Sequence, residues 1–342
     1  MASDPKVARN LRGASAEVRQ RFDNQFEQRQ RASNILSPDE VAGSYDAGRL
    51  LATTLGGEVR ALTAADLQTF KRQAEALGKK FRGGITAKAV IDNSTQADRE
   101  RSNREIRVAI PYQRMGSNVH FITNAGPRSE VVRHHVHVQL LNIDAAVASP
   151  AKASDLVRMV VDGGLKFDCD CEHHQYRFRY IASIGRYNAG RTETGYPKIT
   201  NPNLIGIACK HVLRVMQKMS APDVRQYIEK MIQDGRKMER PKVVRTLKKD
   251  AAEMARLQEK QAGWKRNQVE SAGEKRLRLA QQREVRRVAD AAKGKIAKVA
   301  KVKPETIAVE RRKFEQAARR LAQMGGISQK MLADMLAKLK GK

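Results

Sequence analysis

The sequence predicts an α+β fold that combines a small antiparallel sheet with helices. Apolar residues alternate with polar ones in three neighbouring stretches between residues 106 and 141, which is the period of strands with one buried face. Stretches on either side of them, 63–78 and 153–164, carry apolar residues at helical spacing instead. Strands that follow one another directly, with helices outside them, are typical of an α+β domain.

The first predicted helix, 63–78, has recognisable signals at both ends. Thr63 and Asp66 have the spacing of a capping box, Leu62 lies where a hydrophobic staple closes, and Gly78 supplies a C-cap. The apolar stripe between these ends consists of Leu67, Phe70, Ala74 and Leu77. We therefore expect this helix to dock on a core.

The three predicted strands form the centre of the domain. They are IRVAIPY, NVHFITNAG and VVRHHVHVQLL, at 106–112, 118–126 and 131–141. Short polar connections separate them, as in antiparallel meanders, and the helix at 153–164 follows.

Composition sets the outer limits of the fold. Aromatic residues make up 5% and charged residues 30% of the 342 residues, which predicts a modest core with polar appendages.

We divide the chain into a basic, weakly ordered N-terminal arm (1–58), the α+β domain (59–165), a cysteine-containing segment with a long inserted loop (166–219) and a basic, mostly helical tail (220–342). No apolar run fits a membrane span or a signal peptide, so we expect reduced thiols inside a cell.

The charge predicts the partner. Lys and Arg outnumber Asp and Glu by 66 to 37, a net charge of +29, and residues 221–342 hold 33 basic and 15 acidic residues. The polyvalent anion that fits such a charge in a cell is a nucleic-acid backbone, bound with strong salt dependence. We therefore expect nucleic acid as the partner, with DNA favoured, and neither a membrane nor a small-molecule substrate.

All three cysteines of the chain fall into one pattern with a histidine. Cys169-x-Cys171 is followed after 37 residues by Cys209-x-His211. Three thiolates and one imidazole make a complete tetrahedral set for one structural Zn²⁺ ion. In a strand, residues i and i+2 share a face, so 167–171 would offer both thiolates of the first pair. The second pair precedes a stripe at helical spacing, and a helix N-terminus favours the thiolate. The alternative is three inert buried cysteines and a chance histidine.

CxC followed at a distance by CxH is the motif of the SWIM-type zinc finger, and FDCDC with CKHVLRV resembles it over residues 167–216. The resemblance implies Cys169, Cys171, Cys209 and His211 as zinc ligands, in a module that binds DNA or protein. The gap between the two pairs is longer than is usual in the family, which implies an inserted loop or subdomain.

Five other histidines lie near this pattern. His134, His135 and His137 belong to a predicted strand, where they are ordinary strand residues or phosphate contacts rather than a second metal site. His173 and His174 are alternative zinc ligands, but their adjacency to the first cysteine pair strains a single tetrahedron.

The loop between the two cysteine pairs alternates basic and aromatic residues. In YRFRY, at 176–180, a strand would place the rings on one face and the arginines on the other. We assign the rings to the core and the basic side chains to phosphate contacts. The candidate nucleic-acid contacts are Arg177, Arg179, Arg186, Arg191, Lys198 and Lys210.

The tail begins with a predicted helix, for which Ser220 and Asp223 form a capping pair. Residues 242–300 have the composition of exposed helix without a sustained heptad, so no coiled coil is predicted. The last 37 residues predict two short helices around Gly325 and Gly326.

The sequence lacks the motifs of several common enzyme classes. The chain has no H-x-E with P-C-x-x-C, no H-E-x-x-H, no phosphate-binding G-x-x-x-x-G-K-[ST] loop and no G-x-S-x-G elbow. A zinc ion with four protein ligands also leaves no position for water. The sequence therefore predicts a protein that is not an enzyme.

A second resemblance covers residues 85–216. This region is similar to uncharacterised tailed-bacteriophage proteins with a SWIM-like finger, some of them virion structural or tail-associated. The stretches that carry the similarity are, in order, REIRVAIPY, HFITNAGP, RHHVHVQLL, FDCDC, RYIASIGRYNAGRTETGYPKI and GIACKHVLRVM. This resemblance implies a location in the bacterial cytoplasm or the virion, with other virion proteins as partners.

Three hypotheses of function follow. The first is a zinc-finger protein that binds nucleic acid without sequence specificity through its basic arms. The second is a phage virion protein that contacts packaged DNA. The third is an adaptor that docks other proteins through the finger.

Overall fold

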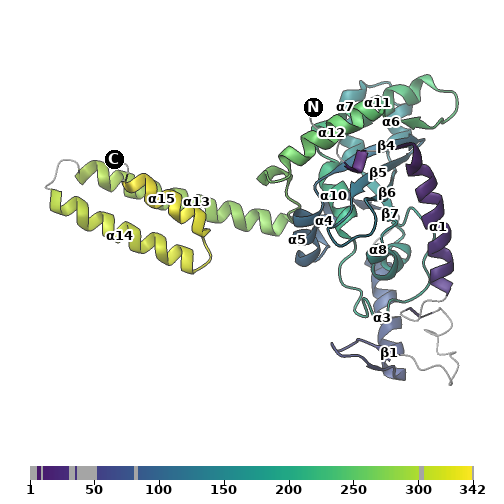
Figure 1. Ribbon diagram of the computed structural model, residues 1–342, viewed down its shortest axis with the longest axis horizontal. Coiled ribbons are helices and arrows are strands. Elements are labelled where there is room, and N and C mark those ends of the chain that lie inside the picture. Colours follow the sequence, from purple (N-terminus) through teal and green to yellow (C-terminus); the bar gives the residue numbers. More distant parts are fainter. Residues whose placement is uncertain are drawn as a thin grey trace. The chain divides into compact units, whose positions relative to one another are not determined.

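A computed structural model describes residues 6–8, 11–30, 35–36, 52–80, 84–299 and 304–340. By their contacts, the residues group into two compact units, Met1–Glu270 and Ser271–Lys342. Helices and strands are labelled in Figure 1. The first unit holds an antiparallel sheet with helices, as predicted, and the second is helical.

A six-stranded antiparallel sheet forms the centre of the first unit, with the strand order β3-β7-β6-β5-β4-β8. Its strands are β3 (Ile85–Thr86), β4 (Ala109–Met115), β5 (Asn118–Asn124), β6 (Arg133–Leu140), β7 (Gly164–Cys169) and β8 (Val244–Arg245). The three predicted strands correspond to β4, β5 and β6, which confirms the predicted meander. A separate two-stranded sheet pairs β1 (Ala52–Thr53) with β2 (Arg60–Ala61).

The main core covers one face of the sheet. Alternate residues of the strands, such as Phe121, Val136 and Phe167, are fully buried there. The helices of this layer are α4 (Ala87–Asp92), α5 (Gln96–Glu105), α6 (Ile143–Ala148), α7 (Ala153–Val161), α8 (Glu172–Arg177), α9 (Arg179–Ile184), α10 (Lys210–Lys218) and α11 (Pro222–Lys237). Of these, α10 packs against β4, β5, β6 and β7 at once, so its first turn is held against the middle of the sheet.

A second, smaller core covers the opposite face. Ile110 and Ile122 of the sheet pack there against N-terminal residues and against α12 (Lys248–Gln261). The N-terminal elements are η1 (Lys6–Ala8), η2 (Leu11–Gly13) and α1 (Ala14–Gln30). The hydroxyl of Tyr112 donates a hydrogen bond of 2.9 Å to the carbonyl of Leu11, which fixes this segment to β4.

The N-terminal segment therefore differs from the weakly ordered basic arm that its composition suggested. Val7, Ala8, Leu11 and Ala14 are buried, and they supply enough apolar surface to dock a chain that is otherwise polar. Residues 1–58 also hold eight basic and eight acidic residues, so this segment is not basic. Its parts at 31–34 and 37–51 lie outside the described residues.

Helix α3 (Ala64–Lys80) begins with the predicted capping box. The backbone N–H of Asp66 donates to Thr63 Oγ1 at 3.3 Å, and the N–H of Thr63 donates to Asp66 Oδ2 at 2.9 Å. Phe70, on the apolar stripe, stacks on Tyr196 with ring centroids 4.3 Å apart. The predicted docking of this helix is confirmed.

Two local predictions were wrong. YRFRY is not a strand: it contains the junction of α8 and α9, and five consecutive residues from Phe178 to Ala182 are buried. Ser220 does not cap the next helix either, because α11 begins at Pro222 with Ala221 as its N-cap. Proline at the first helical position needs no N–H partner, so a side-chain cap is less necessary there.

Residues 220–270, which we expected in the tail, belong to the first unit by their contacts. Helix α11 packs on α7 and α6, α12 packs on β4, and β8 extends the sheet. The short turn η3 (Lys265–Asn267) follows α12.

The second unit consists of three helices, α13 (Ala272–Val299), α14 (Pro304–Gln323) and α15 (Gln329–Lys340). Residues 271–342 hold 20 basic and 7 acidic residues, a net charge of +13. Ala318 and Ile327 are buried in this unit, while most of its described side chains are exposed. Among the described residues, no helix is both long and apolar enough to cross a membrane.

Candidate metal centre

The four predicted ligands converge at one buried point. Cys169 is the last residue of β7, Cys171 and Cys209 are the N-caps of α8 and α10, and His211 lies in the first turn of α10. Their ligand atoms lie within 4.8 Å of one another, and all four side chains are buried. Residues 42 positions apart in the sequence thus form one cluster.

The Cys–Asp–Cys segment is a strand-to-helix turn rather than a continuous strand. Cys171 has extended dihedral angles (φ −77°, ψ 145°) but begins α8, and the N–H of His174 donates to its Sγ at 3.3 Å. A cysteine at a helix N-terminus receives such N–H groups and the positive end of the helix dipole, which stabilise the thiolate. Cys209 has the same position on α10.

The distances fit one tetrahedral ion. A zinc ion with Zn–S bonds of about 2.3 Å separates its sulfur ligands by about 3.8 Å. Here Cys169 Sγ lies 4.0 Å from Nδ1 of His211, and all four ligand atoms lie within 4.8 Å of one another. Small side-chain adjustments suffice to close the cluster around one metal ion.

The three thiols differ in how readily they ionise. Burial and the neighbouring thiols raise the pKa of Cys169 well above its ordinary value. Burial alone would raise the pKa of Cys209 too, but hydrogen bonds from Cys169, Cys171 and His174 hold it well below its ordinary value. Three clustered thiols therefore cannot all ionise by themselves, whereas a divalent cation allows it.

His211 is ready to act as a ligand. Burial lowers the pKa of this imidazole, so it is neutral, which is the form that binds a metal. The ring packs against His134, with centroids 4.3 Å apart. Nδ1 faces the cysteines, and Nε2 is buried without a hydrogen-bond partner among the described residues.

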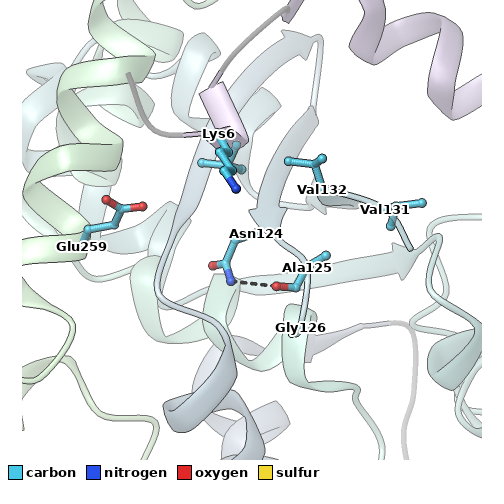
Figure 2. A pocket seen from close by; sticks show the side chains of 8 residues that line it. Lys6, Asn124, Ala125, Gly126, Val131, Val132 and Glu259 are labelled. Carbon is cyan, nitrogen blue, oxygen red and sulfur yellow. Dashed lines mark hydrogen bonds between the residues drawn. The ribbon is translucent and has the colours of Figure 1, made fainter. Parts of the chain in front are cut away.

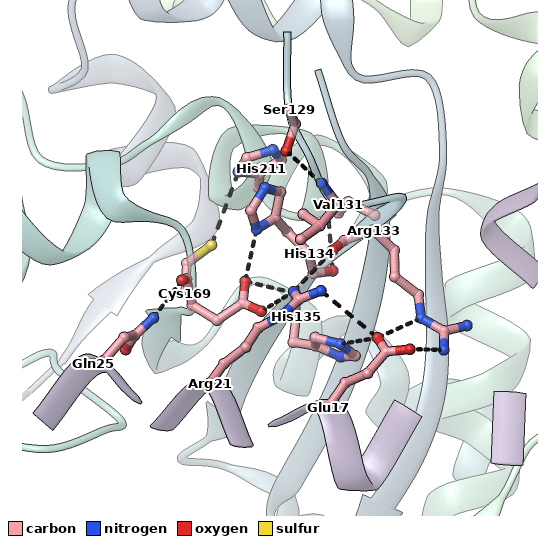
Figure 3. A network of polar contacts seen from close by, with 12 residues as sticks. Glu17, Arg21, Gln25, Ser129, Val131, Arg133, His134, His135, Cys169 and His211 are labelled. Carbon is pink, nitrogen blue, oxygen red and sulfur yellow. Dashed lines mark hydrogen bonds and ion pairs between the residues drawn. The ribbon is translucent and has the colours of Figure 1, made fainter. Parts of the chain in front are cut away.

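Asp170, between the first two cysteines, is surrounded by polar partners that the sequence analysis missed. Its carboxylate accepts hydrogen bonds from the backbone N–H of His135 at 2.9 Å and from Arg21 at 2.5 Å, and it contacts His134 Nδ1 at 3.0 Å. Figure 3 shows Arg21 and Gln25 of α1 pointing into this network. Burial opposes ionisation, but these partners hold the pKa of Asp170 well below its usual range.

The strand histidines have partners other than a metal. His135 is hydrogen-bonded to His120 at 2.9 Å and contacts Glu17 at 3.2 Å, and His137 stacks on His120. Within the described residues, they do not join a second cluster of three metal-binding groups.

His173 and His174, the alternative ligands, are also engaged elsewhere. The ring of His173 packs edge-on against Phe178. His174 Nε2 lies 3.1 Å from Asp168 Oδ1. Burial disfavours its charged form, but hydrogen bonding to Asp168 and Cys209, together with their negative charges, raises the pKa of His174 to about 9. A protonated imidazole is not a ligand, so His174 balances the negative charge beside the cluster.

The candidate nucleic-acid contacts of the loop do not form one surface. Arg179 and Lys198 are 3% and 2% exposed, so neither is available to a phosphate backbone. Arg177 donates to the carbonyl of Thr200 at 2.6 Å, and Lys210 pairs with Glu105 at 2.6 Å. Arg191 is half-buried near Phe22, and Arg186 is exposed.

A pocket of about 420 Å³ lies between η1, the β5–β6 connection and α12 (Figure 2). Lys6 and Glu259 supply opposite charges to its lining. None of the four metal ligands lines it, so it is separate from the metal centre.

Comparisons with known proteins do not assign this chain to a family. Comparison of the chain with protein-family models, with curated proteins and with solved structures found no match. The SWIM and bacteriophage resemblances therefore have no support beyond the motifs themselves. What can be said of function rests on the residues of this chain.

Proposed function

We propose that this protein binds nucleic acid without catalysing a reaction, and that its Cys₃His centre holds one structural zinc ion. The observation that supports zinc is the buried convergence of Cys169, Cys171, Cys209 and His211. Thiolate and imidazole ligands select zinc among the common divalent ions of cells, and four protein ligands are typical of a structural site.

The zinc ion would staple the sheet to the helices that cover it. It would join the end of β7 to the starts of α8 and α10, and so add to the contact between His174 of α8 and Asp168 of β7. A structural zinc ion contributes its binding energy to folding, so metal-free protein should be much less stable.

Support for nucleic acid comes from exposed basic residues outside the loop. We define the basic edge as Lys237, Arg240, Lys242, Arg245, Lys248 and Lys249. All six are exposed, and none forms an ion pair with another described residue. Glu239 and Asp250 are the acidic residues of 237–250, so this segment has a net charge of +4.

The basic edge has a shape that suits a long polyanion. It runs from the end of α11 along the edge strand β8 to the first turn of α12. Lysine in the first turn of a helix is repelled by the positive end of the helix dipole, and a bound anion would reduce this repulsion. The second unit adds a net charge of +13.

The test is binding of the full chain to a DNA duplex and to an RNA of arbitrary sequence, at 50 to 300 mM salt. A variant with Lys242, Arg245, Lys248 and Lys249 changed to Gln should bind more weakly, and its slope of log affinity against log salt should be shallower by about 2 to 4. The control carries Gln at Lys71, Arg72, Lys79 and Lys88, which are exposed on α3 and α4.

If the wild-type chain does not bind either nucleic acid at 50 mM salt, the proposed function is wrong. If it binds and both variants keep its slope, binding uses another surface. The virion and adaptor hypotheses remain predictions of the sequence resemblance. Mass spectrometry of purified particles would test the first of them.

A further inference from the structure

The N-terminal helix α1 contacts the metal centre through one face. Glu17, Arg21 and Gln25 are spaced four residues apart, so they lie above one another on the same side of the helix. In Figure 3 all three point from α1 toward the network beside Cys169 and His211. This face reaches residues that are more than 100 positions away in the sequence.

The point of attachment is the turn between the first two ligands. Arg21 Nη1 donates to Asp170 Oδ2 at 2.5 Å and to the carbonyl of Arg133 at 2.9 Å. The amide of Gln25 donates to the backbone carbonyl of Asp170. Both groups of Asp170, its carboxylate and its carbonyl, are thus held by α1.

One helical turn earlier, Glu17 anchors the same face to β6. Its carboxylate accepts two hydrogen bonds from Arg133, one of them at 2.9 Å, and contacts Nε2 of His135 at 3.2 Å. Gln25 is bound on both sides, because its carbonyl accepts from Gln175 and its side-chain oxygen accepts from Arg179, each at 3.4 Å.

Polar and apolar contacts share this docking. Among the described side chains of α1, Ala14 and Gln25 are buried, while Phe22 is 49% exposed. Val7, Ala8 and Leu11, just before the helix, supply further buried apolar surface. The contacts of Arg21 and Gln25 depend, in addition, on where the Asp170 groups are placed.

The metal ligands fix that placement from the other side. Cys169 and Cys171 flank Asp170, and a bound ion would tie both of their sulfur atoms to Cys209 and His211. Without the ion, the contacts of these two thiols are weak: His174 N–H donates to Cys171 Sγ at 3.3 Å, and Cys169 Sγ lies 4.0 Å from Nδ1 of His211. The turn is thus clamped between the ion and α1.

We propose that docking of α1 and binding of the metal are thermodynamically coupled, so that the N-terminal helix forms the outer part of the metal centre and responds to its occupancy. The coupling is reciprocal: the factor by which docked α1 strengthens metal binding equals the factor by which the metal strengthens docking. This inference rests on the proposed metal site and is independent of nucleic-acid binding.

The first test measures zinc affinity of the full chain by competition with a chelator. The variant Arg21→Ala/Gln25→Ala removes both contacts to Asp170. Loss of outer-shell partners commonly weakens metal binding by about 10- to 100-fold, and we expect a loss in this range. The matched control is Arg19→Ala/Gln28→Ala, which changes the same residue types at exposed positions of α1 and should bind zinc as the wild type does.

The second test needs no variant. Hydrogen exchange of the wild-type chain is compared with and without zinc, and amides of residues 14–30 should exchange faster without it. If the metal-free chain unfolds throughout, exchange cannot report on α1 alone. The ratio of the zinc affinities of the two double variants then tests the coupling. If Arg21→Ala/Gln25→Ala does not fold, Arg21→Lys replaces it, and a smaller but measurable loss of affinity is expected.

Equal zinc affinity of the two double variants would show that α1 is not coupled to the metal. That result is distinct from a failure of the site itself, in which the wild-type chain would bind no zinc. Equal exchange of residues 14–30 in the zinc-bound chain and a folded zinc-free chain would also overturn the coupling.

Discussion

Arg179 and Asp168 form a buried ion pair in which Arg179 Nε donates to Asp168 Oδ1 at 2.9 Å and Nη2 contacts Oδ2 at 3.2 Å. The same guanidinium donates to the carbonyl of Cys169 at 3.1 Å. An arginine that the sequence suggested as a phosphate contact is therefore an internal support for the strand that carries the first metal ligand.

Arg179→Ala should destabilise the protein strongly. Removing one partner of a buried pair typically costs about 3 to 5 kcal/mol, and because His174 still faces Asp168 we expect a cost near the lower end of this range. Urea unfolding of the zinc-loaded protein measures this, with Arg225→Ala as an exposed control that should change the free energy of unfolding by about 0.5 kcal/mol or less. An Arg179→Ala protein as stable as the control would contradict the internal role.

The capping box of α3 predicts a pH dependence. The hydrogen bond from Arg60, followed by those from Thr63, holds the pKa of Asp66 well below its usual range, against the effect of burial. Because the folded-state pKa is lowered, the stabilisation is complete above the unfolded-state pKa of about 4 and is lost as pH falls below it.

Asp66→Ala should therefore cost about 1 kcal/mol at pH 7, which is typical of a lost cap, and the difference from wild type should shrink below pH 4. Comparing the two proteins at each pH removes the effect of zinc release, which both share. Glu75→Ala, exposed on the same helix, is the control. A difference that stays constant down to pH 3 would contradict this origin of the stability.

The first unit should be stable alone and should keep the metal. The four ligands and both sheet cores belong to residues up to Glu270. A chain that ends at Glu270 should keep one zinc per chain and the cooperative unfolding of its sheet. Loss of metal on truncation would show that the second unit supports the centre. Nucleic-acid affinity should fall, because this change removes a net charge of +13.

The central strands and the ligand set could be predicted because local patterns determine them. A strand with one buried face must alternate, as β6 does from Val136 to Leu140. The ligands could be found because the chain has three cysteines and all of them enter one metal-binding pattern. Asp170 stands between two of these ligands, and that position was the one local indication of its role.

Other features could not be predicted because they depend on distant parts of the chain. Alternating rings and arginines at 176–180 fit a strand, but both kinds of side chain are buried in a helical segment, where Asp168 compensates Arg179. The docking of α1 depends on a contact between Arg21 and Asp170 across 149 residues. No local period encodes such a contact.

The most direct test of this account is the metal content of the purified full chain, measured by native mass spectrometry and elemental analysis. We expect one zinc ion per wild-type chain, loss of tight binding in Cys209→Ser, and full occupancy in His173→Ala, whose ring lies beside the site without being a ligand. Because thiolates and neutral imidazole bind the ion, its affinity should fall as pH is lowered. A wild-type chain without zinc, or zinc content unchanged by Cys209→Ser, would contradict the Cys₃His assignment.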